Sequence, residues 1–121
     1  MNADDLIYLT PYLPQWADMA ALEIKQIKNI LQDLDIEKIE HIGSTAVPGL
    51  ASKPVIDIAI KVGRIENGKD AIRPLESFGY LYLAENSDEK HMFFVKGLPP
   101  HGDGRTHHLH FYERDWFDRH T

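Results

Sequence analysis

Two apolar runs on either side of a tight turn constrain the fold of this chain more than any other feature. The first run, residues 39–42, leads into Gly43-Ser44-Thr45, and the second, residues 55–62, is rich in Val and Ile. Such β-branched runs are typical of strands, in which successive side chains point to opposite faces of the sheet. We therefore predict two strands, the second with one apolar face against helices. Its other face carries Val55, Asp57, Ala59 and Lys61.

Two helices are predicted from apolar residues that recur every three or four positions. The first covers residues 14–34, and Glu23 lies with other polar side chains on its solvent-facing side. Its apolar face comprises Ala20, Ile24, Ile27, Leu31 and Leu34. The second covers residues 69–78 and ends at Gly79, a typical helix-ending residue. Pro74 is expected to kink or split it, because proline removes a backbone hydrogen bond.

The rest of the chain predicts three more strands, at residues 80–83, 91–96 and 106–112, and a loop rich in glycine and proline at residues 97–105. Because the chain has 121 residues and neither repeat nor linker, we expect a single domain over residues 1–121. Two helices and about five strands predict an α/β or α+β fold, with the sheet covered mainly on one face.

Composition excludes several classes of protein. The chain has no cysteine, which excludes a disulfide scaffold and a thiolate metal site and is compatible with a reducing cytosol. No apolar stretch approaches the roughly 18–20 residues of a membrane span, so we expect a cytoplasmic protein. The net charge is −6 and the 13 Lys and Arg residues are scattered. This argues against broad nucleic-acid binding but not against a small phosphorylated ligand.

The turn formed by Gly43, Ser44 and Thr45, called the glycine-serine turn below, is a candidate anion site. If a helical turn begins after Gly43, the backbone N–H groups of residues 44–46 point at one spot and Ser44 adds a hydroxyl group. Phosphate oxygens would fit there. Serine and threonine are also common at ordinary helix caps, so the turn by itself favours a cap over a phosphate site.

Asp57 changes this balance, because a carboxylate inside an apolar strand requires a charged partner or a metal ion. It is the candidate metal ligand and catalytic residue. The structural alternative is a salt bridge with Lys53 or Arg105. Lys53 and Arg105 are also candidates for neutralising a bound phosphate, and for Lys53 a solvated loop position is an equal alternative.

Three of the seven histidines, His107, His108 and His110, fall within four positions. Two apart on one strand, His108 and His110 project side by side and can ligate one metal ion as neutral imidazoles, with Asp57 as third ligand if the strands are neighbours. The alternative is a polar, solvent-facing surface without a ligand. His107 is expected to be a hydrogen-bonded core residue, and His41 to orient the turn or the site.

A family resemblance is carried by residues 41–50 (HIGSTAVPGL) and 53–57 (KPVID). Both closely resemble the signature of the GrpB-like family, which belongs to the nucleotidyltransferase superfamily by fold. Residues 11–16, 93–97 and 105–110 are similar to further stretches of that family. The resemblance implies a nucleotidyltransferase-like mixed sheet with helices packed mainly on one face. It also implies that the family continues with a C-terminal helical segment beyond the point where this chain stops.

In active members of that superfamily a glycine-serine turn holds nucleotide phosphates, and two or three carboxylates on adjacent strands bind Mg²⁺. The resemblance implies that Gly43 and Ser44 match the turn and that Asp57 matches the first carboxylate. Ala59 stands at the position of the second carboxylate, and the last strand offers histidines in place of a third. A mixed His/Asp site favours Mn, Zn or another transition metal over paired Mg²⁺ ions.

Three hypotheses for function follow. The first is binding of a nucleotide or similar phosphorylated ligand with a divalent metal ion (Mg or Mn, or alternatively Zn), with transfer of a nucleoside monophosphate as the reaction. The second, motivated by Ala59, is a non-catalytic metabolite-binding or regulatory module with a degenerate site. The third is a metal-dependent hydrolase built on Asp57, His108 and His110. A homo-oligomer is compatible with each, because a partner subunit can cover apolar surface that missing helices leave exposed.

Overall fold

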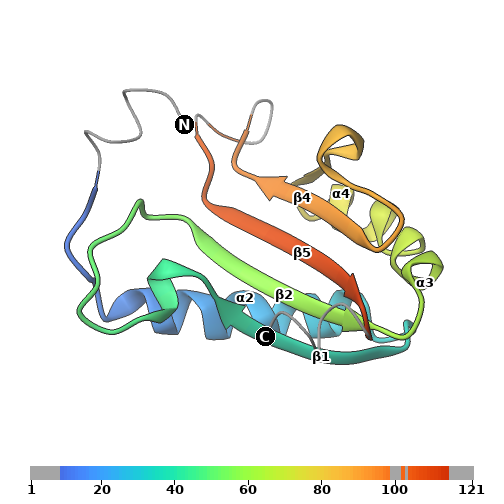
Figure 1. Cartoon of the computed structure of the whole chain (residues 1–121), viewed down its shortest axis with the longest axis horizontal. Helices are drawn as coiled ribbons and strands as arrows, with labels where there is room; N and C mark the ends of the chain where they lie inside the picture. The colour runs from blue at the N-terminus through green and yellow to red at the C-terminus, as the bar shows by residue number, and fades with distance from the viewer. Residues whose placement is uncertain (1–8, 99–101, 103, 115–121) are drawn as a thin grey trace.

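The computed structural model describes residues 9–98, 102 and 104–114, and its centre is a five-stranded sheet (Figure 1). In chain order the strands are β1 (Ile36–Ile42), β2 (Ile56–Val62), β3 (Tyr80–Tyr82), β4 (His91–Lys96) and β5 (His107–Glu113). They lie side by side in the order β1-β2-β5-β4-β3. β2 and β5 run parallel, and the other neighbouring pairs are antiparallel. The predicted mixed sheet is confirmed, with β5 inserted between β2 and β4.

The helices of the described residues pack on one face of this sheet and lie behind the strands in Figure 1. Helix α2 (Gln15–Ile30) contacts β1 and β2, whereas α3 (Ile65–Lys69) contacts β2, β4 and β5. Helix α4 (Ile72–Ser77) contacts β3 and α2. This arrangement confirms the predicted α+β class with helices mainly on one face. Within the described ranges, no helix has the length and apolar character needed to cross a membrane.

The alternation of side chains along the strands divides the sheet into two faces. The helix face supplies the core, and its fully buried members include Ile56, Ile58, Ile60, Leu109 and Phe111. The strand register aligns the intervening residues on the opposite face, called the Asp57 face below. The Asp57 face includes Lys38, Glu40, Ile42, Asp57, Ala59, Lys61, Leu81, His91, Phe93, Val95, His108, His110 and Tyr112.

Helix α2 differs from its prediction in length and in the position of Glu23. The helix ends at Ile30, and residues 31–33 continue as turns, although Leu31 remains buried. Glu23, expected on the solvent side, is 5% exposed. The prediction was wrong because Glu23 lies three residues after Ala20 and four before Ile27, which is within the buried stripe of the helix.

The helix predicted at residues 69–78 corresponds to α4, which begins three residues later, at Ile72; α3 is a separate helix that precedes it and was not predicted. Pro74 does not interrupt α4. It lies in the first turn of α4, where the missing N–H has no helical partner to lose, and the expected kink is therefore wrong. Gly79 ends α4 as predicted, with a φ of 102° that other residues rarely adopt.

The predicted strands agree with the structure to within one residue at most ends, except that β1 begins three residues earlier than the predicted residue 39. The described part of the loop at residues 97–105 has neither helix nor strand, as predicted. Residues 99–101 and 103 of this loop lie outside the described residues. The same holds for residues 115–121, after which the family resemblance implies a C-terminal extension.

Candidate metal and phosphate site

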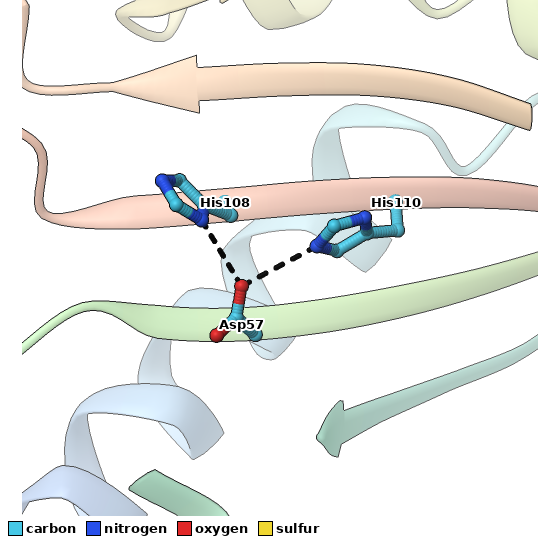
Figure 2. A group of neighbouring side chains, drawn as sticks. All are labelled: Asp57, His108 and His110. Carbon is cyan, nitrogen blue, oxygen red and sulfur yellow. Dashed lines mark hydrogen bonds and ion pairs between the residues drawn. The ribbon is translucent and has the colours of Figure 1, made fainter. Parts of the chain in front are cut away.

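The parallel pairing of β2 with β5 brings Asp57, His108 and His110 together, as Figure 2 shows. Asp57 is in register with His108, and the carboxylate oxygen Oδ1 lies 3.1 Å from His108 Nδ1 and 3.3 Å from His110 Nε2. One potential donor atom from each of the three residues lies within 4.8 Å of the others. These three residues are called the Asp57 cluster below. The strands that carry them are neighbours, which was the condition for the predicted site.

The electrostatics of the cluster keep Asp57 ionised. Burial raises the pKa of Asp57, but hydrogen bonds from His108 and His110, and the charge of these imidazoles, outweigh burial and lower it to about 2. The Asp57 side chain is 24% exposed, so water and ions still reach it. At neutral pH the cluster therefore offers one anionic oxygen beside two imidazole nitrogens.

This donor set fits a single divalent transition-metal ion. Imidazole nitrogens with a carboxylate oxygen suit Mn or Zn, whereas paired Mg²⁺ ions require several oxygen ligands. Ala59 is fully buried and lies between Glu40 of β1 and His110 of β5. The Glu40 carboxylate lies 3.5 Å from Lys38 Nζ and is not a member of the cluster.

The glycine-serine turn approaches the cluster through Gly43. This residue has a φ of 78°, and a Cβ atom built on it would lie 2.8 Å from Asp57 Oδ2. Only glycine therefore allows the backbone to pass this close to the carboxylate. A 3₁₀ turn, Ser44–Ala46, follows directly, in which the Ala46 N–H donates to the Gly43 carbonyl oxygen at 3.1 Å. The expectation that the N–H groups of residues 44–46 are all available to an anion is thus wrong for Ala46.

The side chains of the turn are held by protein contacts. The Ser44 and Ser52 hydroxyl groups are 2.5 Å apart, which ties the turn to the segment that enters β2. Thr45 is buried, and its Oγ1 lies 2.9 Å from His41 Nε2 and donates to the Val55 carbonyl oxygen at 3.4 Å. His41 thus contacts the turn from the helix face, and its expected role in orienting the turn or the site stays a prediction. Burial lowers the pKa of His41, partly offset by Asp57.

The two basic residues predicted to neutralise a bound phosphate, Arg105 and Lys53, differ in their position relative to the Asp57 cluster. Arg105 is exposed, and its Nη1 is 3.5 Å from His108 Nε2, so it reaches the cluster through this histidine. Lys53 is half-buried in the connection before β2, directly after Ser52. The hydrogen bonds that the structure gives to Asp57 come from histidines, in contrast to the salt bridge with Lys53 or Arg105 considered as its alternative.

His91 is a residue of the site for which the sequence predicted no role. Its Nε2 lies 3.3 Å from His110 Nδ1, and its ring stacks on Tyr112 at 4.7 Å between centroids. Phe93 packs on the same imidazole, with 5.0 Å between the ring centres of Phe93 and His110. The alternation in residues 91–96 was the available signal, because it places His91 and Phe93 on one face.

Comparison with known proteins identifies the family. Residues 6–121 match the family described as GrpB protein. This chain belongs to the GrpB family. A UPF0157 protein of Pseudomonas aeruginosa is 42% identical over 127 residues, which cover 97% of this chain and 52% of that protein. The UPF0157 protein YqkA of Bacillus subtilis is 36% identical, over 85% of this chain and 29% of that protein.

The fold is shared with a solved structure. The crystal structure of the conserved protein GrpB from Enterococcus faecalis matches with a TM-score of 0.79 and 36% sequence identity, over 92% of this chain and 64% of that chain. The resemblance seen in the sequence and the fold expected from it are both confirmed. This GrpB-family chain spans about half, or less, of the length of the two bacterial relatives.

Proposed function

We propose that this chain binds one divalent transition-metal ion through Asp57, His108 and His110, and that the ion holds the phosphate group of a nucleotide or similar phosphorylated ligand. The observation that carries the proposal is the convergence of these donor atoms within 4.8 Å, directly beside the close approach of Gly43 to the carboxylate. Transfer of a nucleoside monophosphate is the reaction that we propose for this site.

Each residue of the Asp57 cluster has a distinct task in this proposal. Asp57 supplies the anionic ligand, since its pKa of about 2 keeps it ionised at neutral pH. His108 and His110 supply nitrogen ligands, and the parallel strands fix their spacing relative to the carboxylate. A metal ion held here would polarise a phosphate oxygen and offset the negative charge at the transferring phosphorus.

The phosphate is proposed to lie on the side of the cluster where the glycine-serine turn and Arg105 meet it. Gly43 has no side chain, so the backbone of the turn can pass close to the Asp57 carboxylate, where a Cβ atom would lie 2.8 Å from Oδ2. The exposed guanidinium of Arg105 is placed to neutralise phosphate charge, because it already lies beside His108. Ser44 and Lys53 are proposed as secondary contacts, and ligand binding by Ser44 would compete with its hydrogen bond to Ser52.

Ala59 supports a second candidate, a metabolite-binding or regulatory module without catalysis. It is fully buried at the strand position between Glu40 and His110, and it supplies no second carboxylate. A site with one carboxylate holds one metal ion, whereas the two-metal mechanism of phosphoryl transfer requires two. The donor set also suits the third hypothesis, a metal-dependent hydrolase.

Metal titration followed by a ligand screen tests these candidates. Calorimetric titration with Mn²⁺, Zn²⁺ and Mg²⁺ should give one site per chain that prefers Mn²⁺ or Zn²⁺. Asp57→Asn should weaken binding at least about 100-fold, because loss of a mere outer contact already costs 10–100-fold. Glu40→Gln is the matched control: it removes a carboxylate on the same face, outside the cluster, and should bind metal like the wild type.

The ligand screen uses thermal shift with nucleoside triphosphates, each with and without the preferred metal. A ligand at about 100 times its Kd adds roughly 2.7 kcal/mol, a shift of several degrees for a domain of this size. Turnover of a triphosphate that is lost in Asp57→Asn supports transfer. Binding without turnover supports the regulatory module, and cleavage of a phosphodiester such as bis-p-nitrophenyl phosphate supports the hydrolase. Equal metal affinity of wild type and Asp57→Asn contradicts the proposed site.

A further inference from the structure

His110 has a hydrogen-bonding partner at each ring nitrogen. Its Nε2 faces Asp57 Oδ1 at 3.3 Å, and its Nδ1 faces His91 Nε2 at 3.3 Å. A neutral imidazole carries one N–H, whereas an ionised carboxylate only accepts hydrogen bonds. In the metal-free protein the proton of His110 is therefore placed on Nε2, toward Asp57, and Nδ1 accepts a hydrogen bond from His91 Nε2–H.

Metal ligation through Nε2 requires the opposite arrangement. The lone pair must then be on Nε2 of His110, so its proton must be on Nδ1, which faces His91. If His91 Nε2 still carried its own proton, two N–H groups would point at each other, at a cost comparable to a lost hydrogen bond or more. The conflict disappears when His91 carries its proton on Nδ1, because its Nε2 then accepts. Each ring has one N–H before and after the change, so neither gains charge.

We infer that His91 is a positioning residue that lets His110 reverse its tautomer and so makes His110 Nε2 available to a metal ion. The inference rests on the proposed function, since it assigns a role in the same site. The ring of His91 is held for this role by Tyr112, which stacks on it at 4.7 Å and 16°. The partners that orient a ligating histidine typically change metal affinity 10–100-fold.

His108 provides a comparison, because its partner Arg105 cannot change from hydrogen-bond donor to acceptor. Its Nδ1 faces Asp57 and its Nε2 faces Arg105, whose guanidinium donates hydrogen bonds and accepts none. For His108 to ligate through Nδ1, its proton must be on Nε2, and Arg105 must then move aside. Arg105 is exposed and can do so, whereas His91 lies within the sheet and must change its own tautomer instead.

Nitrogen-15 NMR of the histidine rings tests the inference directly, because long-range couplings distinguish Nδ1–H from Nε2–H. In the metal-free wild type we expect His110 as the Nε2–H tautomer, and in the Zn²⁺-saturated protein as Nδ1–H. His91→Phe keeps a ring for stacking but has no nitrogen, and should lower Zn²⁺ affinity about 10–100-fold. His91→Gln should lose less, because its amide can donate or accept after rotation. Glu40→Gln is the control and should bind Zn²⁺ like the wild type, because Glu40 lies on the same face but outside the cluster.

The outcomes separate this inference from the proposed function. A wild type that binds neither Zn²⁺ nor Mn²⁺ overturns both. A wild type that binds Zn²⁺ together with a His91→Phe variant of equal affinity overturns the role of His91 alone. His110 found as Nδ1–H in the metal-free protein does the same. If His91→Phe does not fold, the tautomer change in the wild type and the affinity of His91→Gln decide the question.

Discussion

Glu23 and Asp57 are carboxylates on opposite faces of the same sheet, and consecutive histidines of β5 lie beside them. His107 Nε2 is 3.7 Å from Glu23 Oε1 on the helix face, and His108 Nδ1 is 3.1 Å from Asp57 Oδ1 on the other. The two carboxylates differ in their remaining partners. Those of Glu23 are the Tyr80 hydroxyl at 2.6 Å and the Lys96 ammonium at 3.0 Å.

The partners decide what each carboxylate can do. A buried tyrosine hydroxyl and a lysine ammonium donate to Glu23 but do not serve as metal ligands at neutral pH, and burial together with Glu23 raises the pKa of Tyr80 far above its usual range. An imidazole nitrogen without a proton can ligate a metal ion, so the imidazoles beside Asp57 are candidate ligands. A histidine next to a carboxylate is therefore a structural contact on one face and a candidate ligand on the other.

The largest expected effect comes from breaking the helix-face group. Glu23→Gln removes the charge that balances Lys96 in a largely buried setting and should cost about 3–5 kcal/mol in the free energy of unfolding, measured by urea denaturation. Zn²⁺ affinity of the folded fraction should be unchanged. The double variant Glu23→Gln/Lys96→Met should lose less than the sum of the single losses. A cost below about 1 kcal/mol would mean that the Glu23 charge contributes no more to stability than an ordinary surface residue does.

Gly43→Ala should combine a loss of stability with a loss of metal affinity. Its Cβ would meet Asp57 Oδ2 at 2.8 Å, and its φ of 78° is strained for alanine, so we expect about 2–4 kcal/mol of destabilisation. Gly49→Ala is the matched control, because Gly49 has a φ of 84° but nothing within 4 Å of an added Cβ. It should cost about 1–2 kcal/mol and leave metal affinity intact. Equal behaviour of both variants would show that the contact with Asp57 is unimportant.

The pH dependence of stability should distinguish the wild-type protein from the Asp57→Asn variant. Since the folded protein lowers the pKa of Asp57 from 3.8 to about 2, the ionised carboxylate stabilises the fold above pH ~4, and this contribution disappears as the pH falls toward 2. Its size is roughly 2 kcal/mol. The difference in unfolding free energy between wild type and Asp57→Asn should therefore shrink between pH 5 and pH 3 in urea titrations. A constant difference would contradict the hydrogen bonds assigned to the cluster.

The smallest effect concerns a single hydroxyl group. Tyr80→Phe removes the hydrogen bond to Glu23 but leaves Lys96 in place, so we expect a loss of about 1–2 kcal/mol. Tyr82→Phe, on the same strand but half-buried, should change stability by less than about 0.5 kcal/mol. Thermal unfolding of both variants measures this difference. If the two losses are equal, the Tyr80 hydroxyl does not stabilise the buried group.

Sequence periodicity was sufficient to predict the strands of the sheet and to identify the three residues of the Asp57 cluster. The alternation at residues 55–62 and 106–112 separates Asp57, His108 and His110 from the core residues between them. Whether these residues lie close together could be predicted only on the condition that their strands are neighbours. A parallel pairing between residues 51 positions apart leaves no local sequence pattern. The GrpB resemblance supplied the expectation of a mixed sheet, and the pairing of β2 with β5 then brought the three residues together.

The residues that could not be predicted are those whose partners come from distant strands. Glu23 was placed toward solvent because of its charge, although its spacing from Ala20 and Ile27 puts it within the buried stripe; Tyr80, Lys96 and His107 satisfy its carboxylate inside the protein. The alternation in residues 91–96 places His91 on one face of its strand, but its contact with His110 depends on the antiparallel register that sets β4 beside β5. In both cases tertiary contacts, rather than local propensity, determine the environment of the side chain.

The central position of β5 has a consequence for the chain during its synthesis. The β1–β2 and β3–β4 pairs leave the ribosome before residue 107 does, and β2 and β4 then each lack their inner neighbour. Two strand edges with unsatisfied backbone groups are thus exposed to other nascent chains until one late strand fills both. The same strand delivers His108 and His110 to Asp57. A product of stalled translation that ends before β5 would therefore combine a tendency to aggregate with the absence of two of the three proposed ligands.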